Sequence, residues 1–522
     1  MVDAASAPLR FGTAGLRGPV RDGPGGMNVG TVTRASWAVA RVLRGHGHAG
    51  ATVVVGHDAR HGSVEFAAAT AEVLAAQGYS VLRLPGPVPT PVVAFGVRRL
   101  GAAAGVMITA SHNPATDNGY KVFVAGGMQI VPPVDGEIEA AMAAAPPVDT
   151  IGRRPVAPTD SALVERYIDA AAAVRRGTGG IRVALTPLHG VGGAVAVEAL
   201  VRSGFTDIHA VAAQFGPNPD FPSVAFPNPE EPGATDALLE LAADVRADIA
   251  IALDPDADRC AVGIPTRNGW RMLSGDETGW LLGDYLLAGR TAQQAAASVV
   301  ASTVVSSRML ASIAAEYGAR HVETLTGFKW LARADDGFPG CTLAYAYEEA
   351  IGHCVDPAAV RDKDGVSAAV LVCDLVAGLR ARRLTVPDAL DALAGRHGVH
   401  TGAAVTRRVG SADEAVAATA RLREHPVGQL AGFPAQATDL AHADGLIYTG
   451  GDADTTVRVV VRPSGTEPKL KCYIEVRRPP GQDVHSARAV AEQLRDRLVE
   501  EVRAWFSGDR TGGRRHRPDR AR

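Results

Sequence analysis

The sequence has few cysteines, and no two of them form a C-x-x-C motif. The five cysteines are far apart in the chain, at Cys260, Cys341, Cys354, Cys373 and Cys472. An odd and dispersed set of this kind excludes a disulfide framework and a zinc site built from cysteine pairs. We therefore expect five reduced thiols.

Long hydrophobic runs and an excess of charge of one sign are also missing. No run of about 18 uncharged apolar residues occurs, which is the length that a helix needs to cross a membrane. The first residues lack a basic region followed by a hydrophobic stretch, so we expect no signal peptide and a cytoplasmic protein. The net charge of -3 gives no reason to expect a nucleic-acid or membrane partner.

The length and composition indicate several folded domains. With 522 residues the chain exceeds what one hydrophobic core usually holds, and 46% of its residues are apolar. Apolar strands are expected at 51–56, 79–84, 102–109, 181–185, 248–253, 298–305 and 342–347, and helices at 63–77, 307–317 and about 364–383. Continuous apolar strands that alternate with helices indicate parallel sheets covered on both faces.

The last part of the chain has a different pattern. Alternating strands at 455–461 and 469–476 are followed by an amphipathic helix at 486–506. We predict three related α/β domains with parallel or mixed sheets and a C-terminal α+β domain. The expected boundaries are 1–170, 171–290, 291–398 and 399–508, followed by a basic tail at 509–522 that we expect to be disordered.

The segment T-A-S-H-N-P places a hydroxyl directly after an apolar strand. Ser111 is the hydroxyl residue, and Lys121 follows it ten residues later. A nucleophile at the end of a buried strand is typical of covalent catalysis, whereas the alternative is an ordinary strand-to-turn junction. A lysine that accepts a proton in such a site needs a lowered pKa.

The segment D-P-D-A-D-R follows another apolar strand. Asp254, Asp256 and Asp258 are carboxylates at alternate positions, and carboxylates held this close repel one another unless a cation lies among them. All-oxygen ligands favour magnesium over zinc. A calcium-binding EF-hand is excluded, because the sixth position is not glycine and Pro265 occupies the twelfth. A solvated acidic turn is the alternative.

The segment R-P-S-G-T-E-P-K lies between the two strands of the last domain. Arg462 and Lys469 supply positive charge, Ser464 and Thr466 supply hydroxyls, and Gly465 lets backbone N–H groups approach an anion. This combination predicts a phosphate-binding loop. The alternative is a polar hairpin loop.

Three further segments carry weaker signals. Y-E-E-A-I-G-H contains Glu349, which can accept hydrogen bonds from sugar hydroxyls, and His353, which taken alone is more often structural. F-G-T-A-G-L-R-G is a glycine-rich loop whose single charge is Arg17, and T-G-F-K-W offers Lys329 as an anion contact.

These segments occur together in one order, and the set resembles the α-D-phosphohexomutase superfamily of phosphoglucomutases and phosphomannomutases. The resemblance extends from about Leu9 to Phe506. It implies four domains around one cleft, a phosphosugar as the small-molecule partner, and a monomer or a dimer. It also implies Mg²⁺ as cofactor and a sugar 1,6-bisphosphate as intermediate and activator.

The resemblance further implies roles for the residues that match its motifs. Ser111 resembles the phosphorylated catalytic serine, which also supplies an oxygen to the metal beside Asp254, Asp256 and Asp258. Lys121 resembles the general acid/base, and Arg17 the arginine beside the reacting group. The remaining matches are Arg259 near the transferring phosphate, Lys329 and Glu349 at the substrate, His353 at a catalytic position, and Arg462, Ser464, Gly465, Thr466 and Lys469 in the loop for the non-reacting phosphate.

One departure concerns the choice of sugar. Many phosphohexomutases have a serine two residues after the sugar-binding glutamate, where this chain has Ile351. E-E-A-I-G with the following R-D-K-D-G-V-S resembles more closely the phosphopentomutase and glucose-1,6-bisphosphate synthase branch. We expect a glucose or mannose phosphate mutase, with a pentose phosphate mutase (ribose 1-phosphate to ribose 5-phosphate) or a glucose-1,6-bisphosphate synthase as the close alternative. A magnesium-dependent sugar phosphatase and a non-catalytic sugar-phosphate-binding protein are alternatives from other classes.

Overall fold

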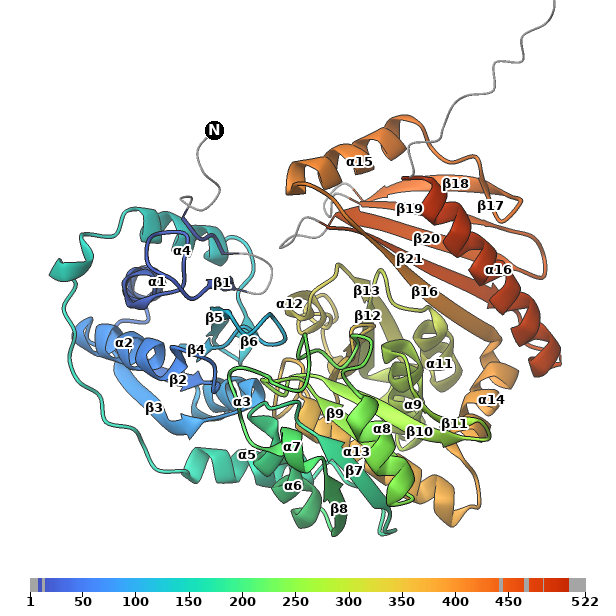
Figure 1. Ribbon diagram of the computed structural model, residues 1–522, viewed down its shortest axis with the longest axis horizontal. Coiled ribbons are helices and arrows are strands. Elements are labelled where there is room, and N and C mark those ends of the chain that lie inside the picture. The colour runs from blue at the N-terminus through green and yellow to red at the C-terminus, as the bar shows by residue number, and fades with distance from the viewer. Residues whose placement is uncertain (1–7, 12–14, 441–444, 464–468, 482, 507–522) are drawn as a thin grey trace, which may run out of the picture. The chain divides into compact units, whose positions relative to one another are not determined.

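The computed structural model describes residues 8–11, 15–440, 445–463, 469–481 and 483–506. The chain forms two compact units, Met1–Leu390 and Asp391–Arg522, which are described separately below. The first unit contains three α/β sheets with their helices, and the second contains one six-stranded antiparallel sheet (Figure 1). Within the described part of the chain, no helix is long and apolar enough to cross a membrane.

The first sheet has the strand order β1-β5-β4-β2-β3, and β6 pairs with β5. Strands β2, β3 and β4 are parallel, whereas β5 is antiparallel to both β4 and β1. The elements are β1 (Leu16–Pro19), α1 (Val29–Gly45), β2 (Thr52–His57), α2 (Ser63–Ala76), β3 (Ser80–Pro87), α3 (Thr90–Leu100), β4 (Ala104–Ile108), β5 (Asp117–Val124), β6 (Met128–Gln129), α4 (Val134–Ala143) and the 3₁₀ turn η1 (Val148–Thr150).

The second sheet has the order β11-β10-β9-β7-β8. Strands β7, β8 and β9 are parallel, and β10 returns antiparallel to β9. The elements are α5 (Ala162–Ala172), β7 (Arg182–Thr186), α6 (Gly192–Arg202), β8 (Asp207–Ala210), α7 (Ala212–Phe215), α8 (Asp236–Asp244), β9 (Ile249–Leu253), β10 (Cys260–Thr266) and β11 (Gly269–Met272).

The third sheet has the order β13-β12-β14-β15. Strands β12, β13 and β14 are parallel, and β15 returns antiparallel to β14. The elements are α9 (Gly275–Ala288), α10 (Ala292–Ala296), β12 (Ser298–Thr303), α11 (Met309–Tyr317), β13 (Arg320–Thr324), α12 (Phe328–Leu331), β14 (Thr342–Glu348), β15 (Gly352–Cys354) and α13 (Gly365–Ala381).

The parallel strands form because their sequences are short, apolar and rich in β-branched residues. All five residues of β4 and all five of β9 are buried, as expected for strands covered on both faces. The three predicted α/β domains are confirmed, and their sheets are mixed. Sequence analysis did not identify the antiparallel return strand β5, because Asp117, Asn118 and Lys121 interrupt its apolar pattern.

The second unit contains a six-stranded sheet with the order β16-β21-β20-β19-β18-β17, in which every pairing is antiparallel. Helix α16 packs on this sheet through Ala487, Ala491, Leu498 and Val502, as predicted from its amphipathic pattern. The elements are β16 (Val399–Arg408), α15 (Ala412–Glu424), β17 (Gln429–Leu430), β18 (Phe433–Leu440), β19 (Gly445–Gly451), β20 (Thr456–Pro463), β21 (Lys469–Arg478) and α16 (Val484–Ala504); α14 (Val386–His397) crosses the boundary between the two units in the sequence.

Candidate active site

Three polar loops occupy the same position in the three α/β sheets. Each loop joins the last parallel strand to its antiparallel return strand: β4 to β5, β9 to β10, and β14 to β15. Each contains one non-glycine residue in the left-handed backbone region, namely Ser111 (φ 53°), Ala257 (φ 52°) and Ile351 (φ 55°). Such a conformation costs about 1–2 kcal/mol, so its recurrence marks the three loops as functional candidates.

Backbone contacts join these loops into one cluster. The N–H of Cys260 donates to the carbonyl of Ile351 at 3.1 Å, and Arg259 and Gly352 form an antiparallel bridge. The N–H of Thr90, at the start of α3, donates to the carbonyl of Asp256 at 2.9 Å. The predicted serine, metal and sugar segments therefore meet in the first unit, although they are far apart in the sequence.

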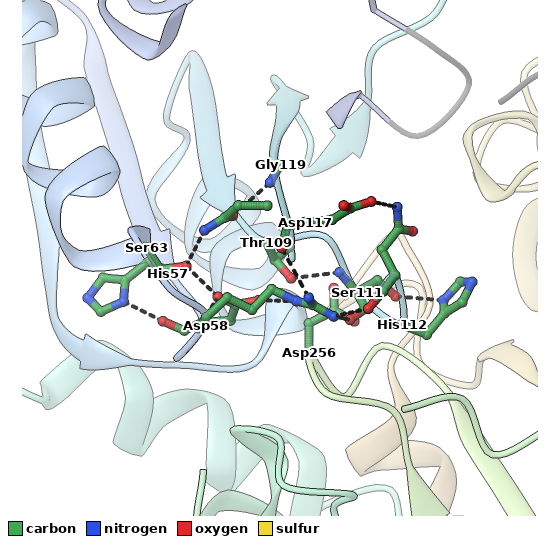
Figure 2. A network of polar contacts seen from close by, with 12 residues as sticks. His57, Asp58, Ser63, Thr109, Ser111, His112, Asp117, Gly119 and Asp256 are labelled. Atoms are coloured by element: carbon green, nitrogen blue, oxygen red, sulfur yellow. Dashed lines mark hydrogen bonds and ion pairs between the residues drawn. The ribbon is translucent and has the colours of Figure 1, made fainter. Parts of the chain in front are cut away.

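Ser111 directs its hydroxyl at the aspartate cluster. Its Oγ donates to Asp254 Oδ2 at 2.7 Å, and the side chain of His112 lies 3.1 Å away through Nδ1. Its backbone N–H donates to Thr109 Oγ1 at 2.9 Å, which holds the turn (Figure 2). Ser111 is 2% exposed, so a reacting group must enter a site that is nearly closed. The structure places the predicted nucleophile beside the predicted metal ligands.

Arg60 holds the Ser111 loop, and sequence analysis did not single it out. Its guanidinium donates to the carbonyls of Ser111 (2.6 Å), Asn113 (2.6 Å), Pro114 (2.7 Å) and Asp117 (3.1 Å). A buried charge with this many carbonyl acceptors fixes a loop that no regular secondary structure supports. The detectable signal was D-A-R directly after the strand β2, at the same sheet edge as T-A-S-H-N-P.

Arg60 is itself held by buried partners. Its Nε lies 3.5 Å from Asp58 Oδ2, and its guanidinium lies over the ring of Phe221 at 4.9 Å. Asp58 in turn accepts hydrogen bonds from Ser63 Oγ at 2.6 Å and from the backbone N–H of Arg60 at 2.9 Å (Figure 2). The contacts of Asp58 and Phe221 therefore hold the Arg60 side chain in place, and Arg60 in turn holds the Ser111 loop.

Asp254, Asp256 and Asp258 lie in one buried loop, and they offer oxygen atoms within 4.8 Å of one another. Their exposed fractions are 0%, 0% and 1%. Burial and the two neighbouring aspartates raise the pKa of Asp254 well above its usual value. Two glycines pack against the backbone of this loop so closely that no larger residue fits. A Cβ atom on Gly190 would lie 2.3 Å from Cα of Pro255, and a Cβ atom on Gly365 would lie 2.3 Å from the carbonyl oxygen of Arg259.

The aspartate cluster fits a divalent cation. Asp256 Oδ1 and Asp258 Oδ1 are buried, and neither has a hydrogen-bond partner among the described residues. A buried carboxylate oxygen without a partner is costly, and a hard cation with oxygen ligands removes that cost. The donor set contains only carboxylate oxygens, which suits Mg²⁺.

Lys121 does not have the lowered pKa that accepting a proton in such a site requires. Its Nζ donates to Asp256 Oδ2 at 2.6 Å and to Asp258 Oδ2 at 2.9 Å. Burial opposes the charged form of the amine, but the two carboxylates outweigh burial and raise the pKa of Lys121. The sequence could not show this, because β5 brings Lys121 to the aspartates only in the folded chain.

Two predicted arginines border the serine loop. Arg17, in β1, donates to Asn113 Oδ1 at 3.1 Å. Arg259 lies 3.1 Å from His112 Nδ1 through Nη1 and 3.9 Å from Glu348 Oε1 through Nη2. Burial opposes the charge of Arg259, yet the surrounding carboxylates, Glu348 foremost, raise its pKa. Both guanidinium groups are therefore in position to face an anion that enters beside Ser111.

Glu349 is held by hydroxyl groups at the end of β12. Its Oε2 accepts hydrogen bonds from Thr303 Oγ1 at 2.9 Å and from Ser306 Oγ at 3.0 Å. The neighbouring Glu348 is buried, and burial raises its pKa. Glu349 is half-buried, so of the acidic pair it is the one that a sugar hydroxyl can reach.

Lys363 is a second residue that sequence analysis passed over, although it lies in the quoted segment R-D-K-D-G-V-S. Its Nζ lies 3.2 Å from Asp258 Oδ2 and 3.7 Å from Asp362 Oδ1. The carboxylates of Asp258, Asp362 and Glu348 outweigh burial and raise the pKa of Lys363. The aspartate cluster thus has two lysine partners, one from the first sheet and one from the start of α13.

His353 packs between strands of the third sheet. It lies in β15, opposite Tyr347 in β14, and its Nδ1 lies 3.0 Å from the hydroxyl of Tyr345. Its ring stacks with both tyrosines and is 0% exposed, and burial lowers its pKa to about 3. A neutral, enclosed imidazole of this kind packs the third sheet, so a catalytic role for His353 requires a contact that this structure does not contain.

The other predicted residues that the structure describes belong to α12 of the first unit and to the sheet of the second unit. Lys329, in α12, lies 3.8 Å from Asp135 Oδ2, and burial lowers its pKa. Arg462 and Lys469 lie at the facing ends of β20 and β21 in the second unit. The predicted loop residues Ser464, Gly465 and Thr466 lie outside the described residues.

Family models match nearly the whole chain. They are described as the phosphoglucomutase/phosphomannomutase alpha/beta/alpha domains I, II and III, which match residues 8–148, 165–267 and 274–394. The C-terminal domain model of the same family matches residues 413–495.

Curated relatives and solved structures agree with these matches. A Haemophilus influenzae protein named "Probable phosphomannomutase" is 37% identical over 90% of this chain and 96% of that protein. A Schizosaccharomyces pombe protein named "Probable phosphoribomutase" is 34% identical over 97% of this chain and 92% of that protein.

Among solved structures, a phosphoglucomutase/phosphomannomutase family protein from Burkholderia thailandensis matches with a TM-score of 0.71 and 19% identity, over 97% of this chain and 99% of that one. Aspergillus fumigatus N-acetylphosphoglucosamine mutase, solved with GlcNAc-6P and magnesium, matches with a TM-score of 0.51 and 16% identity, over 97% of both chains. Both likenesses concern the fold.

Proposed function

Because the chain belongs to the phosphoglucomutase/phosphomannomutase family, we propose that it interconverts the 1-phosphate and 6-phosphate of glucose or mannose through phosphoserine 111. The observation that carries this proposal is the hydrogen bond from Ser111 Oγ to Asp254, with Asp256, Asp258 and Lys121 in the same buried cluster. It joins a nucleophile, a cation site and a proton carrier in one place.

In the proposed reaction a hydroxyl of the sugar monophosphate attacks phosphorus on phosphoserine 111. The bond from phosphorus to Ser111 Oγ breaks as the bond to the sugar oxygen forms, which leaves a sugar 1,6-bisphosphate and a free serine. The bisphosphate turns over, and the reverse step returns its other phosphate to Ser111. The protein mainly positions the two oxygens in line and neutralises charge.

Lys121 is the proposed acid and base for the sugar hydroxyl. Its two ion pairs hold it in the protonated form, so it accepts a proton only when the pairs with Asp256 and Asp258 are broken. Arg17 and Arg259 would hold the transferring phosphoryl group, and Glu349 would accept hydrogen bonds from sugar hydroxyls. Asp254, Asp256 and Asp258 would hold Mg²⁺, which when bound draws charge from phosphoryl oxygens.

Arg462, Ser464, Gly465, Thr466 and Lys469 are proposed to bind the phosphate that does not react. Two observations support this proposal. The segment R-P-S-G-T-E-P-K combines positive charge, hydroxyls and glycine, and Arg462 has a buried Nε with no hydrogen-bond partner among the described residues. Lys329 is proposed as a further anion contact. The catalytic role of His353 and the cytoplasmic location expected from the sequence stay predictions.

A pentose phosphate mutase is the second candidate. Ile351 stands where many phosphohexomutases have a serine, and a relative with 34% identity is named as a phosphoribomutase. Loss of one hydroxyl contact shifts the balance between sugars by a modest factor, because one hydrogen bond contributes about 1 kcal/mol.

A substrate panel distinguishes these candidates. Glucose, mannose, N-acetylglucosamine and ribose 1-phosphates are supplied with Mg²⁺ and catalytic glucose 1,6-bisphosphate, and the products are quantified. We expect the highest kcat/KM with glucose or mannose 1-phosphate. Turnover confined to ribose 1-phosphate would replace the hexose assignment by the pentose one. Stoichiometric release of inorganic phosphate would instead identify a phosphatase.

A further inference from the structure

A cavity of about 520 Å³ lies at the end of the third sheet opposite to Glu349. Its walls include Thr342 and Leu343, the first residues of β14, whereas Glu348 is the last residue of that strand. Ala344 is the lining residue of β14 nearest to Glu348 in the strand, so at about 3.3 Å per residue the strand separates the cavity from the candidate active site by roughly 13 Å. The cavity is therefore a separate place in the first unit.

Arginine side chains dominate the polar lining of this cavity. Five arginines line it, against two acidic residues: Arg98, Arg175, Arg176, Arg290 and Arg361 against Asp335 and Asp356. Its volume lies within the range of about 300–1,000 Å³ that is usual for sites of small ligands.

Two of the arginines are neutralised by the fold. Arg361 pairs with Asp335, and Arg175 lies 3.7 Å from Asp374 through Nε. These two therefore need no further anion.

The other three arginines form no ion pair with a carboxylate among the described residues. Arg98 donates to the carbonyls of Ala358 (2.7 Å) and Gly126 (3.3 Å). Arg176 donates to the carbonyl of Tyr285 at 3.1 Å, and Arg290 donates to Ser298 Oγ at 3.1 Å. These acceptors are neutral, so three positive charges remain against the single carboxylate of Asp356.

Arg176 and Arg290 act on each other electrostatically. Burial and the charge of Arg176 lower the pKa of Arg290, and Arg290 Nε is buried without a partner in the described part of the chain. Like charges that share a concave site repel unless an anion lies between them. Arginine is also the residue best shaped to bind phosphate and carboxylate groups in pairs of hydrogen bonds.

The rest of the wall is apolar, and it suits the organic part of a ligand. Leu286, Val355, Pro357 and Leu371 line the same cavity. We propose that this cavity is a regulatory binding site for a small organic phosphate, distinct from the site at Ser111.

A covalent path of three residues connects the cavity to the catalytic cluster. Arg361 lines the cavity, and Lys363 makes the ion pair with Asp258. Pro357 and Ala358 line the cavity in the same segment between β15 and α13, so a ligand that packs against them shifts the lysine beside the aspartate cluster. Binding at the cavity is thereby coupled to catalysis through a short and identified segment.

The test uses the full-length enzyme and 3-phosphoglycerate as probe, because this compound carries a phosphate and a carboxylate and is not a sugar. Its affinity is measured by calorimetry for the native protein, for the double variant Arg176→Gln with Arg290→Gln, and for Arg166→Gln, whose arginine lies on the exposed face of α5 outside the cavity. We expect the double variant to bind at least roughly tenfold more weakly, and Arg166→Gln to bind like the native protein.

The second readout is the mutase rate with and without the probe. We expect 3-phosphoglycerate to change kcat of the native enzyme at least twofold and to leave kcat of the double variant unchanged, while the rates without probe agree. Equal affinity of the native protein and the double variant overturns the site. Binding that leaves kcat unchanged overturns its regulatory role, and inorganic phosphate binding as tightly as the probe overturns the organic class of ligand. Both variants are checked by thermal unfolding, so a folding defect is recognised.

Discussion

The loops that carry Ser111 and Glu349 occupy the same position in two related sheets, but the fold holds them in different ways. The backbone of the Ser111 loop is tied by one buried guanidinium, which donates to four carbonyls. Glu349 is held through its side chain by two neutral hydroxyls. Both sets of bonds include one ionised partner, so they differ in what they hold: the guanidinium ties four backbone carbonyls of the Ser111 loop, whereas the hydroxyls bind one carboxylate oxygen of Glu349.

The loop between them, with Asp254, Asp256 and Asp258, is held by its neighbours. Its backbone receives N–H groups from Thr90 and Gly365. The same strand-loop-strand unit thus carries the proposed nucleophile, the proposed cation site and the proposed sugar contact in its three copies. The three loops thus differ in the contacts that hold them, and mutations in each loop should have different effects.

The largest effect is expected for Ser111→Ala. Removing Oγ leaves no atom to carry the phosphoryl group, so kcat should fall by on the order of 10⁴-fold or more. Steady-state turnover and intact-protein mass check this, since the native enzyme should carry a phosphate adduct that the variant lacks. The loop stays tied by Arg60, so the unfolding temperature should change little. Turnover within tenfold of the native enzyme contradicts the phosphoserine mechanism.

Asp256→Asn tests whether the loop between β9 and β10 binds the cation, in contrast to the loop between β14 and β15 that carries Glu349. The change keeps the shape of the side chain and removes one charge from the cation site, so the magnesium concentration for half-maximal activity should rise roughly 100-fold or more. Glu349→Gln is the matched control. It should raise KM for the sugar phosphate and leave the magnesium dependence unchanged. If both variants shift the magnesium dependence equally, the division of tasks between the loops is wrong.

Arg60→Lys tests whether the guanidinium fixes the serine loop. Lysine keeps the charge but cannot reach four carbonyls, so kcat should fall by roughly 10- to 100-fold with KM nearly unchanged. Hydrogen exchange should become faster in residues 109–117. A loss of activity that follows the loss of folded protein, with unchanged exchange in this loop, would assign Arg60 to general stability instead.

The smallest effect is expected for Ala257→Gly. Glycine adopts φ 52° without the penalty that alanine has, so the free energy of unfolding should rise by about 0.5–1 kcal/mol. Ile351→Gly relieves the same strain but removes a side chain that is 2% exposed and packs in the core of the second sheet, so it should lower stability by about 2 kcal/mol. Chemical denaturation measures both. A stabilised Ile351→Gly would show that strain outweighs packing there.

Much of the candidate site was predictable because its residues follow apolar strands. Ser111 follows β4 and Asp254 follows β9, and both were identified from the apolar run before them. Polar residues at strand ends of α/β sheets gather at one edge, so the sequence pattern is enough to group them.

The supporting residues were not predictable in the same way. Arg60 and Lys363 lie in segments whose role depends on what they face, and a single arginine or lysine has no periodic signature. The raised pKa of Lys121 could not be read from the sequence for the same reason, because its two carboxylate partners come from another sheet. The role of His353 was expected from its match to a family histidine, and the sequence did not show that antiparallel pairing of β14 and β15 stacks its ring with two tyrosines.

The sequence by itself determined which segments are buried strands, which polar residues follow them, and the family to which the motifs belong. These properties depend on local chemistry, since apolar runs form strands and each motif is contiguous in the chain. Only the tertiary structure decided which charges meet, which loops are tied, and where five arginines gather around a cavity. Those outcomes depend on contacts between residues far apart in the sequence, and no local pattern encodes the distance between them.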